Sequence, residues 1–88
     1  MTKNYKIIDI QHSGNKAEKG LPKVGDKYDR RRGQVVTIDF DEYEPGNILV
    51  FNQDTRAFLY TTPFVGITND EHYIYVETVN SIYVLEEV

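Results

Sequence analysis

Short runs of β-branched and aromatic residues recur along the whole chain, and this pattern limits the fold more than any other sequence feature. Strands favour these residue types, whereas an amphipathic helix needs apolar side chains at i, i+3, i+4 and i+7 over about eleven residues or more. No window of the sequence has that helical spacing. The pattern therefore predicts an all-β protein, with six strands expected at 5–11, 34–40, 47–52, 57–62, 72–78 and 81–87.

Turn-forming residues separate the expected strands. The segment 44–47, Glu-Pro-Gly-Asn, matches a type II turn, because proline presets φ at the second position and glycine accepts the positive φ needed at the third. Two further turns are expected at 52–56 and 68–71. Pro63 should end the strand that precedes it, because proline cannot donate a hydrogen bond to a ladder.

The length of the chain allows only one small core. A chain of 88 residues buries roughly 60 to 65% of its unfolded surface, so we expect a single β domain over 1–88 with a long basic loop at about 12–34. Five to six short antiparallel strands favour a small barrel or curled sheet, SH3-like or OB-like, because closure removes exposed strand edges. A small β-sandwich is the alternative.

The composition excludes several classes of site. The chain has no cysteine, so it cannot form disulfides, thiolate metal sites or a cysteine nucleophile. The apolar run at 7–10 is interrupted by Asp9 and is too short for a signal sequence, and no stretch approaches the roughly eighteen apolar residues of a membrane span. We therefore expect a cytoplasmic protein.

The charges are distributed unevenly in a chain whose formal net charge is -4. Residues 1–34 hold nine basic and four acidic side chains, a net of +5, and residues 35–88 hold one basic and ten acidic side chains, a net of -9. Such asymmetry can mark an electrostatic binding face, but two halves that fold against each other would neutralise it. We favour the interpretation in which the two halves fold against each other and neutralise their charges.

The last two strands predict a hairpin with two different faces. If residues 79 and 80 form a two-residue loop, Val76 lies opposite Tyr83 and Ile74 lies opposite Leu85, so these side chains share the core face. The other face is too apolar to be turned freely to water, so we expect either another part of the same domain, for instance the strand at 5–11, or a partner protein to cover it. This candidate protein-binding face consists of Tyr73, Tyr75, Ile82 and Val84.

Two charged segments are further candidates. The acidic segment Asp39, Asp41, Glu42 and Glu44 could attract a basic partner, although a charged hairpin end that protects neighbouring strand edges is the more common role. The basic segment could bind the phosphates and bases of single-stranded nucleic acid, or its arginines could pair with acids of the negative half. Its candidate contacts are Lys23, Lys27, Tyr28, Arg30, Arg31 and Arg32.

Catalytic residues are scarce. His12 and His72 lie sixty residues apart without a metal-binding spacing, and the chain has neither a nucleophile elbow nor a glycine-rich phosphate loop. We therefore expect no enzymatic activity, no cofactor and no metal. The sequence predicts a small binding domain for another protein, with single-stranded nucleic-acid binding as the alternative function.

Overall fold

The computed structural model describes residues 1–14, 31–53 and 57–88. The predicted basic loop and the turn at 52–56 therefore lie largely outside the described residues. The elements in chain order are β1 (Lys3–His12), β2 (Val35–Ile38), the 3-10 helix η1 (Phe40–Glu42), β3 (Ile48–Gln53), β4 (Phe58–Asn69), β5 (Ile74–Thr78) and β6 (Ser81–Glu87).

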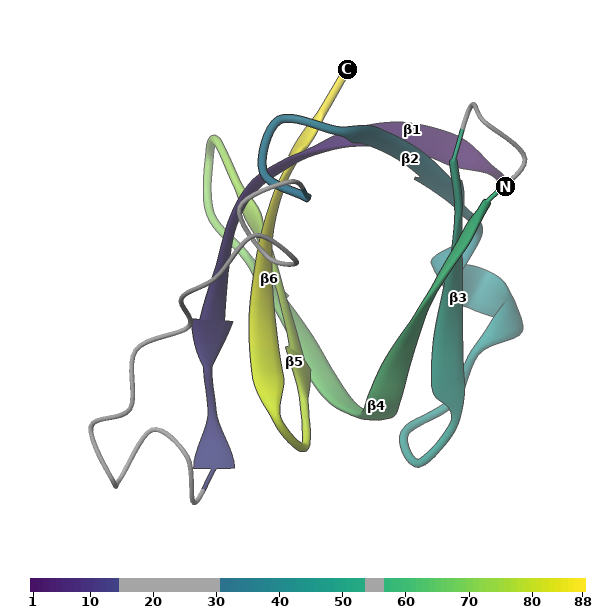
Figure 1. The fold of residues 1–88 in the computed structure, drawn as a ribbon, viewed down its shortest axis with the longest axis vertical. Coiled ribbons are helices and arrows are strands. Elements are labelled where there is room, and N and C mark those ends of the chain that lie inside the picture. The colour runs from purple at the N-terminus through teal and green to yellow at the C-terminus, as the bar shows by residue number, and fades with distance from the viewer. Residues whose placement is uncertain (15–30, 54–56) are drawn as a thin grey trace.

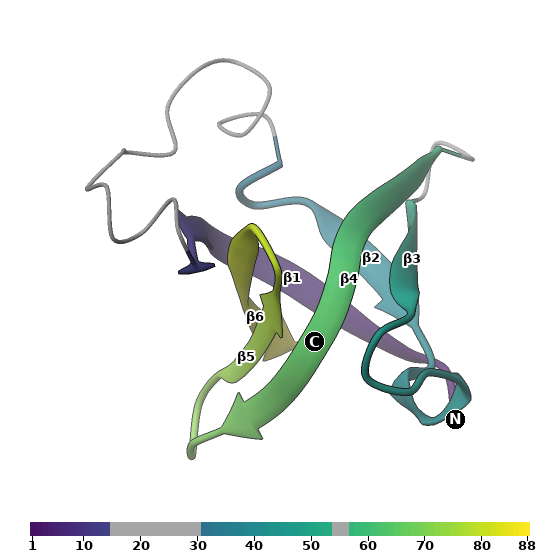
Figure 2. The same cartoon turned by 90° about the horizontal axis from the view of Figure 1, so that it is seen from below.

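The six strands form a closed antiparallel barrel (Figures 1 and 2). Each strand pairs with the next one in the chain, and β6 returns to pair with β1. This confirms the predicted all-β barrel and excludes the sandwich. The strictly sequential order also differs from the Greek-key order of an OB-like barrel, which was one of the two forms expected.

The barrel interior is filled by alternate side chains of all six strands, as the period of two in a strand requires. Phe51 is fully buried near the middle of a series of aromatic contacts: its ring centroid lies 6.2 Å from that of Phe40 and 5.7 Å from that of Tyr83. Tyr5 extends the series, 5.4 Å from Phe40. The buried core comprises Tyr5, Ile7, Ile10, Val36, Ile38, Leu49, Phe51, Phe64, Val76, Tyr83 and Leu85.

The fourth strand is longer than predicted, because Pro63 does not end it. Phe64 donates its N–H to Asn47 and accepts from Gly46, both across 2.7 Å, so its backbone groups face β3. Successive residues of a strand point these groups to opposite edges, so the N–H that Pro63 lacks would not have faced β3. The strand continues to Asn69, and its register shifts between Phe64 and Gly66 where it leaves β3 and pairs with β5.

The connection from β2 to β3 combines a correct prediction with a wrong boundary. The turn at 44–47 forms as expected, with Gly46 at a φ of 98° and the Asn47 N–H donating to the Glu44 carbonyl at 3.0 Å. The strand expected to reach residue 40 instead ends at Ile38. The Asp39 carboxylate accepts the Asp41 N–H at 3.0 Å, and this local hydrogen bond starts η1 in place of the ladder.

A group of hydroxyls, buried except for the partly exposed Thr62, joins the end of β1, β4 and the β5–β6 turn. We call Ser13, Thr62 and Thr78 the hydroxyl cluster. Thr62 donates to the Thr78 hydroxyl at 2.8 Å, and Ser13 donates to the Thr78 carbonyl at 2.7 Å. Gly14 follows at a φ of 58°, and a Cβ there would lie 2.8 Å from the Val79 carbonyl oxygen, so the chain needs glycine at this close approach.

Candidate protein-binding surface

The β5–β6 hairpin has the two-residue loop that the sequence predicts. Val76 pairs with Tyr83 and Ile74 pairs with Leu85, on either side of a loop at 79–80. Val76, Tyr83 and Leu85 are buried in the core. The predicted core face therefore points into the barrel, and the candidate protein-binding face points outward.

One of the covers predicted for that outward face, the strand at 5–11, is wrong. The strand at 5–11 does not lie over β5 and β6; it forms part of β1 and pairs with the edge of β6, where Gln11 is opposite Ile82. The edge-to-edge pairing of β1 with β6 closes the barrel. The outer side of β1 therefore continues the outer surface of β5 and β6 and does not cover it. Val84 is nevertheless only 7% exposed, whereas Tyr75 and Ile82 are partly exposed.

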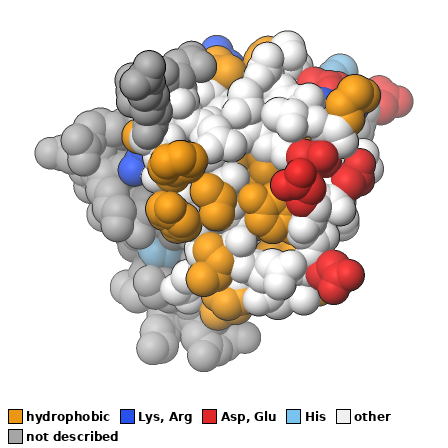
Figure 3. Space-filling model, turned by 90° about the vertical axis from the view of Figure 1, so that its right-hand side faces the viewer, with side chains coloured by type: hydrophobic (Ala, Val, Ile, Leu, Met, Phe, Trp, Pro, Cys, Tyr) orange, Lys and Arg blue, Asp and Glu red, His pale blue; other side chains and the backbone are white. Residues whose placement is uncertain are grey.

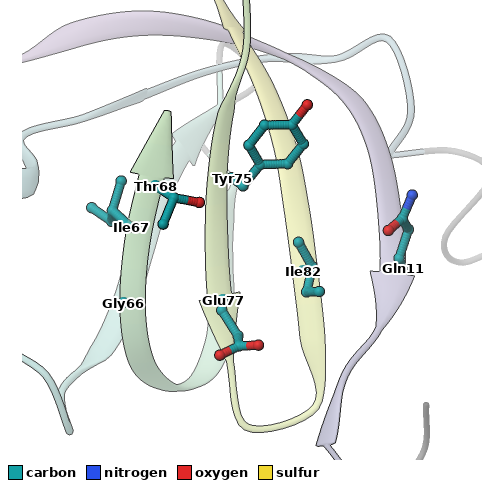
Figure 4. A pocket seen from close by; sticks show the side chains of 7 residues that line it. All are labelled: Gln11, Gly66, Ile67, Thr68, Tyr75, Glu77 and Ile82. Atoms are coloured by element: carbon teal, nitrogen blue, oxygen red, sulfur yellow. The ribbon is translucent and has the colours of Figure 1, made fainter. Parts of the chain in front are cut away.

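Tyr75 and Ile82 line a hollow on the outer surface of the barrel (Figure 4). We call this the outer hollow. It has a volume of about 400 Å³ and spans strands β4, β5, β6 and β1. Of the predicted face, Tyr73 and Val84 are not part of it. Its lining residues are Gln11, Gly66, Ile67, Thr68, Tyr75, Glu77 and Ile82.

The turn before β5 fixes the Tyr75 ring at the hollow. The Asp70 carboxylate accepts the backbone N–H groups of His72 and Tyr73, both at 2.8 Å, and the Tyr75 hydroxyl at 3.0 Å. The backbone hydrogen bonds from Tyr73 and His72 are the main reason that the pKa of Asp70 is lowered. The hydrogen bond that the Tyr75 phenol donates to Asp70 raises the pKa of this phenol. The ring of Tyr73, by contrast, lies beside that of His72, with 6.2 Å between the two ring centroids.

The lowered pKa of Asp70 predicts a stability effect in acid. The ionised carboxylate stabilises the fold fully above the ordinary pKa of about 3.9, and this stability is lost as the pH falls through the lowered folded value. Asparagine keeps an acceptor oxygen without the charge. We therefore expect Asp70→Asn to have a lower urea midpoint than the wild type at neutral pH and the same midpoint in strong acid.

The neighbouring Glu71→Gln is the control for this prediction, because within the described residues no hydrogen bond to the Glu71 carboxylate is seen. Its urea midpoint should follow the wild type across the whole pH range. A carboxyl carbon titration by NMR that places the Asp70 pKa at or above the ordinary value would contradict the prediction.

The four candidate acids do not act as one group. Asp39 caps η1 and lies 2.8 Å from the amino group of Met1, which lowers the pKa of its carboxyl. Asp41 lies 3.4 Å from the same amino group. Glu42 and Glu44 are exposed and form no ion pair within 1–14, 31–53 and 57–88. Asp39 therefore shapes the turn, and the free negative charge lies mainly on Glu42 and Glu44.

The arginine triplet is only partly visible. Lys23, Lys27, Tyr28 and Arg30 lie outside the described residues, and Arg31 lies in the turn at 31–33, partly exposed. Arg32 donates to the Asp9 carboxylate at 2.8 Å and to the Ile10 carbonyl at 3.0 Å.

Asp9 lies within the basic segment 1–34, so this ion pair of Arg32 does not join the basic segment to the acidic remainder of the chain. Burial raises the pKa of Asp9, but the hydrogen bonds from Arg32, Gln11 and the Ile10 N–H together lower it.

The two histidines lie at opposite ends of the β5–β6 hairpin. His12 pairs with Ser81 beside the 79–80 loop, whereas His72 precedes the other end of β5. They therefore do not form the paired acid–base site that catalysis by these residues would require.

The described residues also include an exposed apolar surface that the sequence reasoning missed. We call Ile48, Phe58, Tyr60, Pro63 and Val65 the β3–β4 patch. Four of its side chains are more than half exposed: Ile48 53%, Phe58 52%, Tyr60 65% and Val65 51%. Figure 3 shows hydrophobic side chains gathered on this side of the barrel, with acidic side chains beside them. The alternation in 57–62 indicates only that Phe58 and Tyr60 face one side of the strand and that Leu59 and Thr61 face the other.

Comparisons of this chain with protein-family models, with curated proteins and with solved structures found no match. Among the described residues, no helix has the length and apolar character to cross a membrane. Within the same residues, no three His, Asp or Glu side chains cluster as a metal site would require. The predicted cytoplasmic location stays a prediction.

Proposed function

We propose that this chain is a non-catalytic binding domain that recognises another protein through the outer hollow. One observation carries the proposal: Ile67, Tyr75 and Ile82 turn apolar surface outward into a single hollow of about 400 Å³. Apolar surface on the outside of a closed barrel commonly marks a place where a partner buries a side chain.

The hollow has the character of a protein-binding pocket. The hydrogen bond to Asp70 holds the Tyr75 ring in place before a partner arrives, so binding loses less side-chain entropy. Tyrosine is enriched among the residues that dominate interface energies. Gln11 and Glu77 add polar groups around the apolar floor, which would orient a bound segment.

Single-stranded nucleic-acid binding through the basic segment has less support. Arg32 is engaged by Asp9 and the Ile10 carbonyl, which leaves its guanidinium fewer donors for phosphate. Four of the six candidate contacts lie outside the described residues. No comparable surface feature among the described residues favours this function over protein binding.

The proposal is tested by substitutions in the hollow that preserve the fold. We expect Tyr75→Ser and Ile82→Ser each to weaken binding of a partner, first identified by affinity capture with the wild-type chain, by at least about tenfold in calorimetry. Hydrogen exchange of the complex should protect the backbone of β5 and β6 around these residues.

The control is Val88→Ser, because Val88 is 60% exposed and does not line the hollow. This variant should bind the partner as the wild type does, and circular dichroism should show that all three variants are folded. A partner that binds folded Tyr75→Ser and Ile82→Ser with unchanged affinity would remove the hollow as the binding site.

A further inference from the structure

The β3–β4 patch shares no residue with the outer hollow, and its two aromatic rings are its main feature. Phe58 and Tyr60 point outward from the first half of β4, with ring centroids 6.3 Å apart and ring planes inclined by 44°. They are 52% and 65% exposed, so each ring retains open surface for a partner. Exposed aromatic faces carry negative charge density and attract cations such as guanidinium and ammonium groups.

The patch continues across the pair of strands without a charged side chain. Tyr60 pairs with Val50, and Ile48 pairs with Pro63, so the apolar side chains of β3 and β4 form one connected surface. Val65 extends it along β4. A contiguous apolar surface on a small folded domain commonly marks an interaction site.

Free negative charge lies directly beside this apolar surface. The turn after η1 is held against β4 by the two hydrogen bonds between Phe64 and the residues Gly46 and Asn47, each 2.7 Å long. Glu44 is the first residue of that turn and Glu42 lies two residues before it, and both are exposed. Figure 3 shows acidic side chains bordering the hydrophobic ones on this face. The acids are therefore placed to meet the charges of any segment that covers the patch.

We propose that the β3–β4 patch is a second interaction surface and that it binds a protein segment in which arginine or lysine alternates with apolar residues. The apolar side chains of such a segment would cover Ile48 and Val65. Its cations would stack on Phe58 and Tyr60 and approach Glu42 and Glu44. Two copies of this chain joined patch to patch would fit less well, because the patch itself offers no basic side chain to meet those acids. The proposal is independent of the function assigned to the outer hollow.

The test uses the full chain labelled with ¹⁵N and two short synthetic peptides of equal length. Arginine alternates with leucine in one peptide, and glutamate alternates with leucine in the other. We expect the arginine peptide to shift the amide signals of Ile48, Phe58 and Tyr60. Its affinity should exceed that of the glutamate peptide by about tenfold and fall several-fold between about 0.05 and 0.5 M salt, because salt screens exposed charges.

Substitutions separate the patch from the hollow. Loss of both rings in the double variant Phe58→Ser/Tyr60→Ser should lower the affinity for the arginine peptide by roughly tenfold. The double variant Glu42→Gln/Glu44→Gln should lower this affinity several-fold. Ile82→Ser, which alters the outer hollow, should leave its affinity unchanged. All variants should keep dispersed amide spectra, because the substituted patch residues are exposed.

Four outcomes would overturn the proposal. Equal affinity for the two peptides would show that charge does not select the partner. Loss of binding in Ile82→Ser but not in Phe58→Ser/Tyr60→Ser would assign the peptide to the outer hollow. If the arginine peptide shifts no amide signal of the β3–β4 patch, the patch does not bind this ligand. Patch signals that move with protein concentration alone, together with a dimer in sedimentation that Tyr60→Ser dissociates, would assign the patch to a second copy.

Discussion

Phe51→Ala should lower the free energy of unfolding by about 3–5 kcal/mol, the usual cost of truncating a fully buried phenylalanine. Phe51 is 0% exposed and contacts both Phe40 and Tyr83, so its loss leaves a cavity between aromatic rings contributed by different elements. A domain of this size has few other core residues to compensate. Urea denaturation followed by circular dichroism measures the effect.

Phe58→Ala is the matched control, because it removes the same atoms from a side chain that is 52% exposed on a neighbouring strand. Its cost should be under about 1 kcal/mol. Similar losses for the two variants would contradict the assignment of Phe51 to the centre of the core and of Phe58 to the surface.

Thr78→Val should lower the free energy of unfolding by about 1–3 kcal/mol, although the two side chains have nearly the same shape. The Thr78 hydroxyl accepts from Thr62 at 2.8 Å and from the Ser81 N–H at 3.1 Å, and it donates to the Ser81 carbonyl at 3.1 Å. Valine removes these three hydrogen bonds at a position that is 1% exposed. The hydroxyl cluster then loses its central member.

Thr37→Val makes the same chemical change on the outer face of β2, where Thr37 is partly exposed and pairs with Asn52. Its urea midpoint should remain close to that of the wild type. If Thr78→Val unfolds at the same urea concentration as Thr37→Val, the hydroxyl cluster contributes no net stability.

The features that the sequence could predict are those set by neighbouring residues. The turn at 44–47 follows from the φ preferences of Pro45 and Gly46, and the β5–β6 register follows from a two-residue loop. Once the loop length is known, alternation places Val76 and Tyr83 on one face. A barrel, with a β-sandwich as its alternative, follows in turn from short antiparallel strands whose edges need partners.

The features that the sequence could not predict depend on distant pairing. Whether Phe58 or Leu59 faces the core is decided by the register with Phe51, which pairs with Leu59. The residue types alone would place the larger aromatic ring inside. The local chemistry of Pro63 predicts the end of a strand, but the strand edge that its nitrogen faces depends on pairing with β3. The pairing of Arg32 with Asp9 joins positions twenty-three residues apart and has no sequence signature.

The length of β4 has a consequence for a partner with two binding segments. The strand carries Phe58 and Tyr60 in its first half and Ile67 in its second, so one continuous backbone fixes the spacing between the β3–β4 patch and the outer hollow. If both surfaces bind as proposed, occupation of one turns binding at the other into an intramolecular step. If the tether between the two segments of the partner matches this spacing, the overall affinity would rise by roughly 10²–10⁴-fold without any new contact. A tether too short to span the two surfaces would give no such increase.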